Sequence, residues 1–238
     1  GNRFMIPKAF IQAWSATAPW PDPRQVEQDL IICRALCDLF NAPLLKGKIA
    51  FRGGTAINKL LFTRPLRYSE DIDLVQTQAE PIGATVDAIR DALSWLGTCK
   101  REQAGHSMHL VFRFAPEVDT QTTLKLKVEI NTREHQSFLG LKSYPFAVEN
   151  DWYQGEAKIL SFEPEELFST KLRALLQRRK NRDLFGVSVN TMLGDWAIGG
   201  EVSYRPRDGV GIDPTVPLVE TARGLDPTVL VNARLFPD

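Results

Sequence analysis

The spacing of apolar residues along the chain predicts both helices and strands. Between Val26 and Phe40, five apolar residues recur at steps of four, three, four and three, which is the stripe of an amphipathic helix. Asp22 followed by Pro23 fits the cap and first turn of that helix. Residues 124–130 instead alternate apolar and charged side chains, the period of a strand with one buried face. Shorter patterns predict helices at 55–62, 85–96 and 163–180, and strands at 49–51, 71–74 and 109–114.

Glycine and proline divide the chain into parts of different character. Residues 194–238 hold six Gly and five Pro, whereas the preceding 193 residues hold ten of each. The share in this last part approaches the level of about 25–30% that is typical of irregular chain, so we expect few regular elements there. We therefore expect a core with an N-terminal arm at residues 1–150, a helical region at 151–193 that completes the cleft, and an irregular tail at 194–238.

Composition and charge narrow the class of protein. Hydrophobic residues make up 43% of the chain, and 29 basic residues balance 29 acidic ones, so any polyanion site must be a local patch. The apolar runs fall far short of the roughly 18 residues of a membrane span, and no secretory signal is recognisable. We expect a cytoplasmic protein without a membrane partner, in which Cys33 and Cys37 are small core residues. His106, His109 and His135 lack zinc-like spacing with the cysteines and are interpreted as surface or strand residues.

A Gly-Gly-Thr motif and an Asp-x-Asp motif carry the candidate chemistry. Gly53 and Gly54 stand where a strand gives way to a helix, so a phosphate can approach the backbone closely and meet unpaired N–H groups. The hydroxyl of Thr55 can add a donor. Asp71 and Asp73 are two residues apart on a strand, so both carboxylates leave the same face and form an oxygen-rich site suited to Mg²⁺ or Mn²⁺.

Glu129 is the candidate for a third carboxylate of this metal site. It lies on the polar face of the strand predicted at 124–130, and a carboxylate from a neighbouring strand would complete the site. The alternative is a surface glutamate paired with Lys127 or Lys125, an interaction worth about 0–1 kcal/mol.

Several segments together resemble a known family. The stretch FRGGTAINKL at residues 51–60, followed by RYSEDIDL at 67–74, is similar to the AbiEii/AbiGii toxin family, as are VEQDL at 26–30, KLRAL at 171–175 and NRDLF at 181–185. The resemblance covers about residues 24–185. It implies the α+β fold of the DNA polymerase β-like nucleotidyltransferases, a mixed sheet flanked by helices. A helical segment and the irregular Gly/Pro-rich C-terminal tail would follow this core.

The resemblance also implies an activity and further site residues. Family members move a nucleoside monophosphate from a nucleoside triphosphate (NTP) to an acceptor and release pyrophosphate; known relatives are toxins of type IV toxin–antitoxin pairs, and some modify tRNA. Lys171 and Asp183 match functional residues of the family and join Asp71 and Asp73 as expected catalytic residues. Lys171 is also expected to bind the triphosphate, together with Ser69 and Arg182, which are among the expected nucleotide-binding residues.

Three interpretations of the function stay open. The first is an Mg²⁺-dependent toxin that acts on tRNA or another RNA, with an antitoxin encoded nearby; six of the twelve residues from Lys171 to Arg182 are basic, as RNA binding requires. The second keeps the chemistry but has a small molecule or a protein side chain as acceptor. The third is a weakened relative that binds nucleotide or a partner without turnover; it is favoured by Gly186, which stands where the family has a second aspartate.

Overall fold

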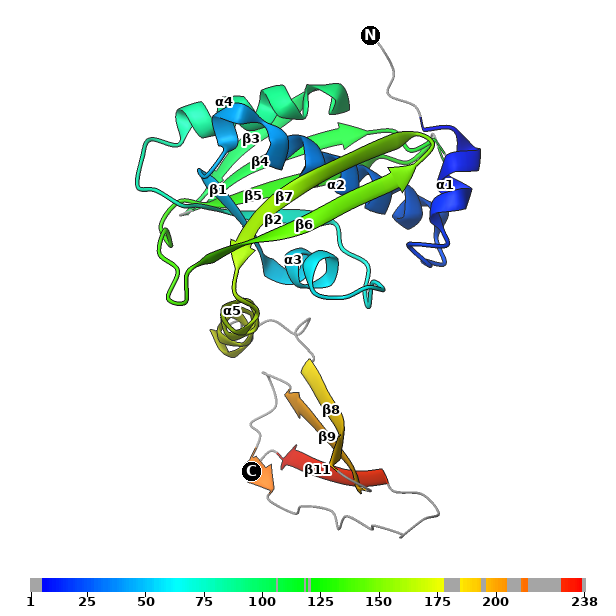
Figure 1. Cartoon of the computed structure of the whole chain (residues 1–238), viewed down its shortest axis with the longest axis vertical. Coiled ribbons are helices and arrows are strands. Elements are labelled where there is room, and N and C mark those ends of the chain that lie inside the picture. The colour runs from blue at the N-terminus through cyan, green and yellow to red at the C-terminus, as the bar shows by residue number, and fades with distance from the viewer. Residues whose placement is uncertain are drawn as a thin grey trace. The chain divides into compact units, whose positions relative to one another are not determined.

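The chain forms two units, Gly1–Lys171 and Leu172–Asp238. The computed structural model describes residues 6–105, 107–117, 119, 121–177, 185–193, 196–204, 211–213 and 228–236. The first unit contains a seven-stranded sheet with helices, and the second contains a four-stranded sheet (Figure 1).

Helices and strands of the first unit largely follow the predicted order. The helices are α1 (Lys8–Trp14), α2 (Pro23–Asn41), α3 (Gly53–Leu60), α4 (Gly83–Ala92) and α5 (Pro164–Gln177), with 3-10 turns η1 (Pro43–Leu45) and η2 (Ser94–Leu96). The strands are β1 (Ile49–Arg52), β2 (Asp71–Gln76), β3 (Cys99–Ala104), β4 (Ser107–Phe114), β5 (Leu124–Asn131), β6 (Leu141–Asn150) and β7 (Tyr153–Phe162). None of the described helices is long and apolar enough to cross a membrane.

The seven strands form a mixed sheet, which confirms the fold expected from the family resemblance. Their order is β3-β4-β5-β2-β1-β7-β6. The pairs β2–β5 and β1–β7 are parallel, and the other four neighbouring pairs are antiparallel. The central strands β1, β2 and β5 carry the sequence motifs, so residues from distant parts of the chain share one region of the sheet.

Helix α2 supplies much of the core. The carboxylate of Asp22 accepts a hydrogen bond from the backbone N–H of Arg24 at 2.9 Å and Pro23 opens the helix, which confirms the predicted cap. Many of its apolar residues, among them Leu30 and Leu36, are fully buried, whereas Phe40 is partly buried, and the helix packs against β5, β6 and β7. The long helix therefore fixes strands from both halves of the sheet.

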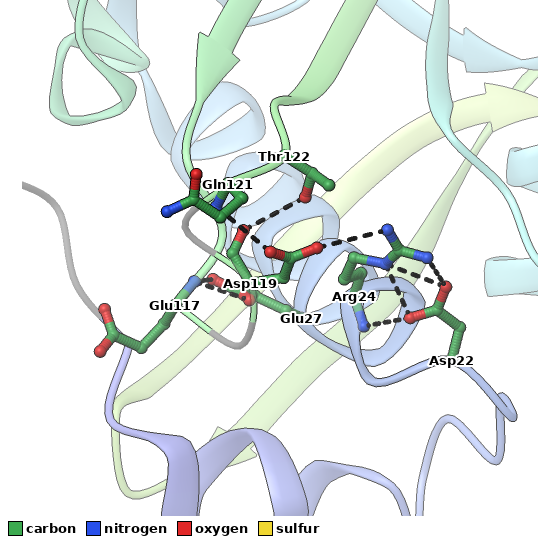
Figure 2. A network of polar contacts seen from close by, with 7 residues as sticks. All are labelled: Asp22, Arg24, Glu27, Glu117, Asp119, Gln121 and Thr122. Atoms are coloured by element: carbon green, nitrogen blue, oxygen red, sulfur yellow. Dashed lines mark hydrogen bonds and ion pairs between the residues drawn. The ribbon is translucent and has the colours of Figure 1, made fainter.

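The N-terminal end of α2 also holds the connection between β4 and β5 (Figure 2). The guanidinium of Arg24 bridges Asp22 at 2.6 Å and Asp119 at 3.6 Å. The buried carboxylate of Glu27 accepts the backbone N–H of Glu117 at 2.9 and 3.1 Å. These bonds position the chain that enters β5, the strand that carries Glu129.

Three strands of the first unit, β3, β6 and β7, fall outside the predicted elements. In β6 the sequence LKSYPFAVEN contains Pro145 and lacks a strict alternation. A strand tolerates proline at the edge of a sheet, and β6 is such an edge strand, paired only with β7 among the described strands. The sheet thus extends to Phe162, beyond the division expected at residue 150.

The second unit contains strands where an irregular tail was expected. They are β8 (Phe185–Leu193), β9 (Trp196–Tyr204), β10 (Gly211–Asp213) and β11 (Thr228–Phe236), in the order β10-β11-β9-β8. Eight of the eleven Gly and Pro residues at 194–238 lie outside these strands, and apolar residues alternate at 229, 231, 233 and 235. The composition of the whole segment averages strands with the connections between them, and the difference arises from this averaging.

Candidate active site

Strand register brings four polar side chains into one row across the sheet. Arg52 on β1 pairs with Asp73 on β2, Asp73 pairs with Glu129 on β5, and Glu129 pairs with His109 on β4. Residues that stand opposite one another on adjacent strands project from the same face. The row therefore places Glu129 beside Asp73, as the sequence analysis expects of a third carboxylate.

Lys127 lies between two of the carboxylates. It is the register partner of Asp71, and its Nζ is 3.2 Å from Oδ2 of Asp71 and 3.2 Å from Oε2 of Glu129. The two carboxylate oxygens are therefore at most twice that distance apart. Nε2 of His109 lies 3.4 Å from the same oxygen of Glu129. Glu129 is thus paired with Lys127, as one interpretation of the sequence expects, and lies close to an aspartate of the motif; its role as a third metal carboxylate stays a prediction.

Asp73 is the carboxylate whose ionisation the site opposes. Burial, and then the negative charges of Glu129 and Asp71, raise the pKa of Asp73 to about 6, although Lys127 and Arg52 act in the other direction. In contrast, the hydrogen bond and charge of Lys127 hold the pKa of Glu129 below its ordinary value, in spite of the opposing effect of burial. Asp73 therefore lies in a negative potential that disfavours its own ionisation, and an additional cation would relieve this potential.

The donor chemistry fits a hard divalent cation at Asp71 and Asp73. Carboxylate oxygens are the ligands that Mg²⁺ prefers, and both side chains leave the same face of β2. Among the described residues, no group of three or more His, Cys, Asp or Glu side chains has the arrangement of a formed metal site. The ammonium of Lys127 lies between the other pair of carboxylates, those of Asp71 and Glu129.

The start of α3 lies directly against this cluster. Gly53 has a φ of +80°, and a Cβ at this position would overlap the carboxylate of Asp73, so only glycine fits. At Gly54 the nearest atoms to such a Cβ belong to the guanidinium of Arg67, at 3.7 to 3.8 Å. No described side chain caps α3, and its first turn holds no acidic residue. The helix therefore presents N–H groups beside an arginine, which suits an anion.

Thr55 has a structural bond that the sequence analysis did not foresee. Its side chain is buried, and its hydroxyl donates to the backbone carbonyl of Asp71 at 2.8 Å. This bond joins the first turn of α3 to the start of β2 and occupies the donor that was expected to meet the triphosphate. Contact between Thr55 and nucleotide stays a prediction, carried by its backbone N–H.

The segment that leads into β2 is held by a buried amide. Nε2 of Gln28 donates to the carbonyls of Glu70 and Lys125 at 3.2 and 3.0 Å, and its Oε1 accepts the hydroxyl of Tyr68 at 2.8 Å. The neighbouring Ser69 is buried, and its hydroxyl has no hydrogen-bond partner among the described residues. Its expected role in nucleotide binding stays a prediction.

The C-terminal candidates are placed only in part. Lys171 is half-buried on α5, in the same helix as Leu167, which is buried, and Phe168, which is 48% exposed. Arg182 and Asp183 lie outside the described residues. The roles expected for these three polar residues from the family resemblance stay predictions.

Four residues that lie at the site were given no site role from the sequence, namely Arg52, Arg67, His109 and Lys127, the last of which was considered only as a pairing partner of Glu129. Lys127 and Glu129 already share a face in the alternation at 124–130, and Arg67 belongs to the segment RYSEDIDL. The pairing of β5 with β2, which sets Lys127 opposite Asp71, cannot be predicted from these patterns.

The fold is shared with solved nucleotidyltransferase structures. MenT4, a nucleotidyltransferase toxin from Mycobacterium tuberculosis H37Rv, superposes with a TM-score of 0.53 at 14% identity, over 76% of this chain and 62% of that protein. JHP933 and a putative nucleotidyltransferase, both from Helicobacter pylori, have TM-scores of 0.46 at 16% and 17% identity, over 68% of this chain and 63% and 65% of theirs. The chain thus spans less than two thirds of the length of each. The likeness to MenT4 shows a shared fold, that of a nucleotidyltransferase toxin.

The family is given by a sequence model. The model described as "Nucleotidyl transferase AbiEii toxin, Type IV TA system" matches residues 34–185, more than half of the chain. The protein therefore belongs to the AbiEii family. Curated protein sequences contain no match to it. The matched region includes the start of α3, the Asp71–Asp73 pair and Glu129, so the family match and the charged row coincide.

Proposed function

We propose that this protein is a metal-dependent nucleotidyltransferase, the toxin of a type IV toxin–antitoxin pair, which transfers a nucleoside monophosphate from an NTP to tRNA or another RNA. The observation that carries the proposal is the juxtaposition of the Asp71–Asp73 pair with the uncapped start of α3, inside the region that matches the AbiEii family. One element supplies carboxylates for cations, and the other supplies N–H groups for phosphate.

The start of α3 is the proposed triphosphate site. The backbone N–H groups at Gly53, Gly54 and Thr55 would donate to phosphate oxygens, and Arg67 stands beside Gly54 to balance their charge. In the reaction, the acceptor oxygen forms a bond to the α-phosphorus while the bond from this phosphorus to the leaving pyrophosphate breaks.

Asp71 and Asp73 are the proposed ligands of Mg²⁺ or Mn²⁺, with Glu129 as a third carboxylate. These residues would hold a divalent cation, which would supply Lewis-acid chemistry: activation of the acceptor hydroxyl and stabilisation of charge on the leaving pyrophosphate. The raised pKa of Asp73 supports this assignment, because a bound cation would relieve the repulsion among the three carboxylates.

The C-terminal residues complete the proposal. Lys171 would neutralise charge on the triphosphate as pyrophosphate leaves, and Arg182 would contact phosphate. Asp183 would orient Lys171 or a neighbouring arginine, or help to position the acceptor, rather than bind metal. The basic run from Lys171 to Arg182 supports a polyanionic acceptor such as RNA. The cytoplasm is the proposed compartment, and the proposed partner is an antitoxin encoded nearby.

A labelling experiment tests the activity and identifies the acceptor. The protein is incubated with each α-³²P-labelled NTP, Mg²⁺ or Mn²⁺ and total cellular RNA, and the labelled product is separated by size and by nuclease or protease treatment. Label on tRNA is the expected result. Asp73→Ala should abolish labelling, whereas Asp87→Ala, which removes an exposed carboxylate on α4, should leave it unchanged.

The other outcomes contradict parts of the proposal. Label on protein or on a small molecule would overturn the RNA acceptor. No label with any NTP would favour a binding protein without turnover, the reading that Gly186 supports. Activity of Asp73→Ala within about tenfold of wild type would remove the metal assignment, because metal catalysis contributes several kcal/mol.

A further inference from the structure

Lys127 makes an unusual pair of contacts for a lysine beside the proposed metal site. Its ammonium is shared between Asp71 on β2 and Glu129 on its own strand β5, at 3.2 Å from each. The register of two parallel strands enforces this position, since Lys127 stands directly opposite Asp71. The ammonium contacts the same carboxylate oxygens that a divalent cation at this place would take as ligands.

The surroundings distinguish these contacts from an ordinary surface ion pair. The side chains of Lys127, Asp71 and Glu129 are 28%, 39% and 33% exposed, so they are reachable from solvent but partly screened from it. Asp73 adds a third carboxylate in register with Glu129. The ammonium of Lys127 therefore faces more negative charge than it can neutralise alone, although Arg52 stands opposite Asp73 on the other side.

Lys127 is suited to leave these contacts without leaving the site. A lysine carries its charge on a flexible four-carbon stem, in contrast to the rigid planar fork of arginine. Its backbone is held in the centre of the sheet between β2 and β4. The charge can therefore move aside when another cation takes the carboxylates, while strand pairing stays as it is.

We propose that Lys127 competes with the divalent cation for Asp71 and Glu129 and thereby sets the metal affinity of the site. Lys127 is thus a positioning residue: it holds the carboxylates of β2 and β5 together, and it weakens metal binding because a cation must displace its ammonium. This inference rests on the proposed function, in so far as that function assigns a divalent cation to the carboxylates.

Direct metal binding tests the inference without any enzymatic assay. Mn²⁺ is titrated into the full chain, and free Mn²⁺ is measured by electron paramagnetic resonance for wild type, Lys127→Met, Lys127→Gln and Lys125→Met. Lys125 is the matched control, because it is an exposed lysine two residues away on the same strand. Its replacement removes the same charge from the region but not from the shared contacts.

Both Lys127 variants are expected to bind Mn²⁺ at least about tenfold more tightly than wild type, because a short-range competitor is removed. Lys125→Met should stay within about twofold, as an exposed charge is screened by solvent. As a second readout, saturating Mn²⁺ should raise the melting temperature of Lys127→Gln by more than that of wild type. A purely structural Lys127 would lower the melting temperature of the variants and leave this metal-induced increase unchanged.

Three results would overturn the inference. They are equal or weaker Mn²⁺ binding by the Lys127 variants, an equal gain in Lys125→Met, and no Mn²⁺ binding by any of the proteins. Transfer activity does not enter these measurements. A wild-type protein that labels no acceptor, while the Lys127 variants bind Mn²⁺ more tightly, would contradict the proposed function and support the role of Lys127.

Discussion

Two clusters of a lysine with carboxylates, one in the core and one in the candidate site, differ in whether their charges are balanced. In the core, Nζ of Lys59 lies 2.6 Å from Oδ1 of Asp29, and their side chains are 10% and 2% exposed. The other oxygen of Asp29 accepts Nε1–H of Trp14 at 3.0 Å. One positive and one negative charge are matched, and both carboxylate oxygens have partners.

The site cluster is unmatched. Lys127 faces Asp71 and Glu129, with Asp73 adjacent, and burial followed by the repulsion of Glu129 and Asp71 raises the pKa of Asp73. Burial without compensation is costly, so the core tolerates only a complete pair. The half-exposed site tolerates an excess of carboxylates, and this excess is what gives it affinity for a further cation.

Helix α3 connects the two clusters. Its first residue, Gly53, lies against the carboxylate of Asp73, and near its other end Lys59 reaches Asp29 on α2. A complete ion pair in the core thus anchors the helix whose start forms the proposed triphosphate site. Changes at the two ends should therefore have different consequences, which the following variants test.

The largest loss of stability is expected from Lys59→Met. It leaves the carboxylate of Asp29 buried without its partner, which costs about 3–5 kcal/mol of the free energy of unfolding. Urea denaturation followed by circular dichroism measures this. Lys127→Met, the matched change in the half-exposed cluster, should cost about 1 kcal/mol or less. Equal losses in the two variants would show that the clusters do not differ in the way described above.

The sequence predicts the elements that have one buried face and a clear period. The stripe from Val26 to Phe40 and the alternation at 124–130 correspond to α2 and β5. It does not predict β6, because Pro145 and a mixed pattern give no period, and the strand depends on pairing with β7. Likewise, the composition does not predict the strand at 228–236, because this strand lies in a Gly/Pro-rich segment.

For the site, the sequence predicts which side chains share a face of one strand, but it does not predict how the strands pair. The same-face placement of Asp71 and Asp73 follows from the two-residue period of a strand. The position of Lys127 between carboxylates depends on the register of β2 with β5, whose pairing residues are more than 50 positions apart in the chain. Likewise, the sequence predicts a helix from Thr55, which the structure begins two residues earlier at Gly53, but the bond from the Thr55 hydroxyl to the carbonyl of Asp71 is a tertiary contact.

The next effect in size concerns Asp73 and has a definite pH dependence. Its pKa is raised from 3.8 to about 6 in the folded protein, so the ionised carboxylate destabilises the fold. Asp73→Asn removes this cost and should raise the free energy of unfolding by about 3 kcal/mol at pH 7.5. The gain should shrink as the pH falls below about 6 and vanish below about pH 3, where the wild-type carboxyl is protonated in both the folded and the unfolded state.

Denaturation curves between pH 4.5 and 8 measure this dependence. Asp87→Asn, on the exposed surface of α4, is the control and should show no gain that changes with pH. An Asp73→Asn protein that is less stable than wild type at pH 7.5 would contradict the view that charge excess is a cost of the site. Together with a loss of transfer, the expected gain would identify Asp73 as a residue kept for function against stability.

The smallest effect on stability is expected at the start of α3, where two adjacent glycines should respond differently. Gly53→Ala places a Cβ at a φ of +80° and against the carboxylate of Asp73, and the backbone conformation alone costs about 1–2 kcal/mol. Gly54→Ala meets Arg67 only at 3.7 to 3.8 Å, so its free energy of unfolding should stay within about 0.5 kcal/mol of wild type.

Because the Cβ at residue 53 displaces Asp73, Gly53→Ala should also weaken Mn²⁺ binding, whereas Gly54→Ala should weaken NTP binding and leave Mn²⁺ binding intact. Calorimetric titrations with Mn²⁺ and with NTP separate the two. Equal behaviour of the two variants would mean that the two glycines do not divide the metal and triphosphate functions at the start of α3 in this way.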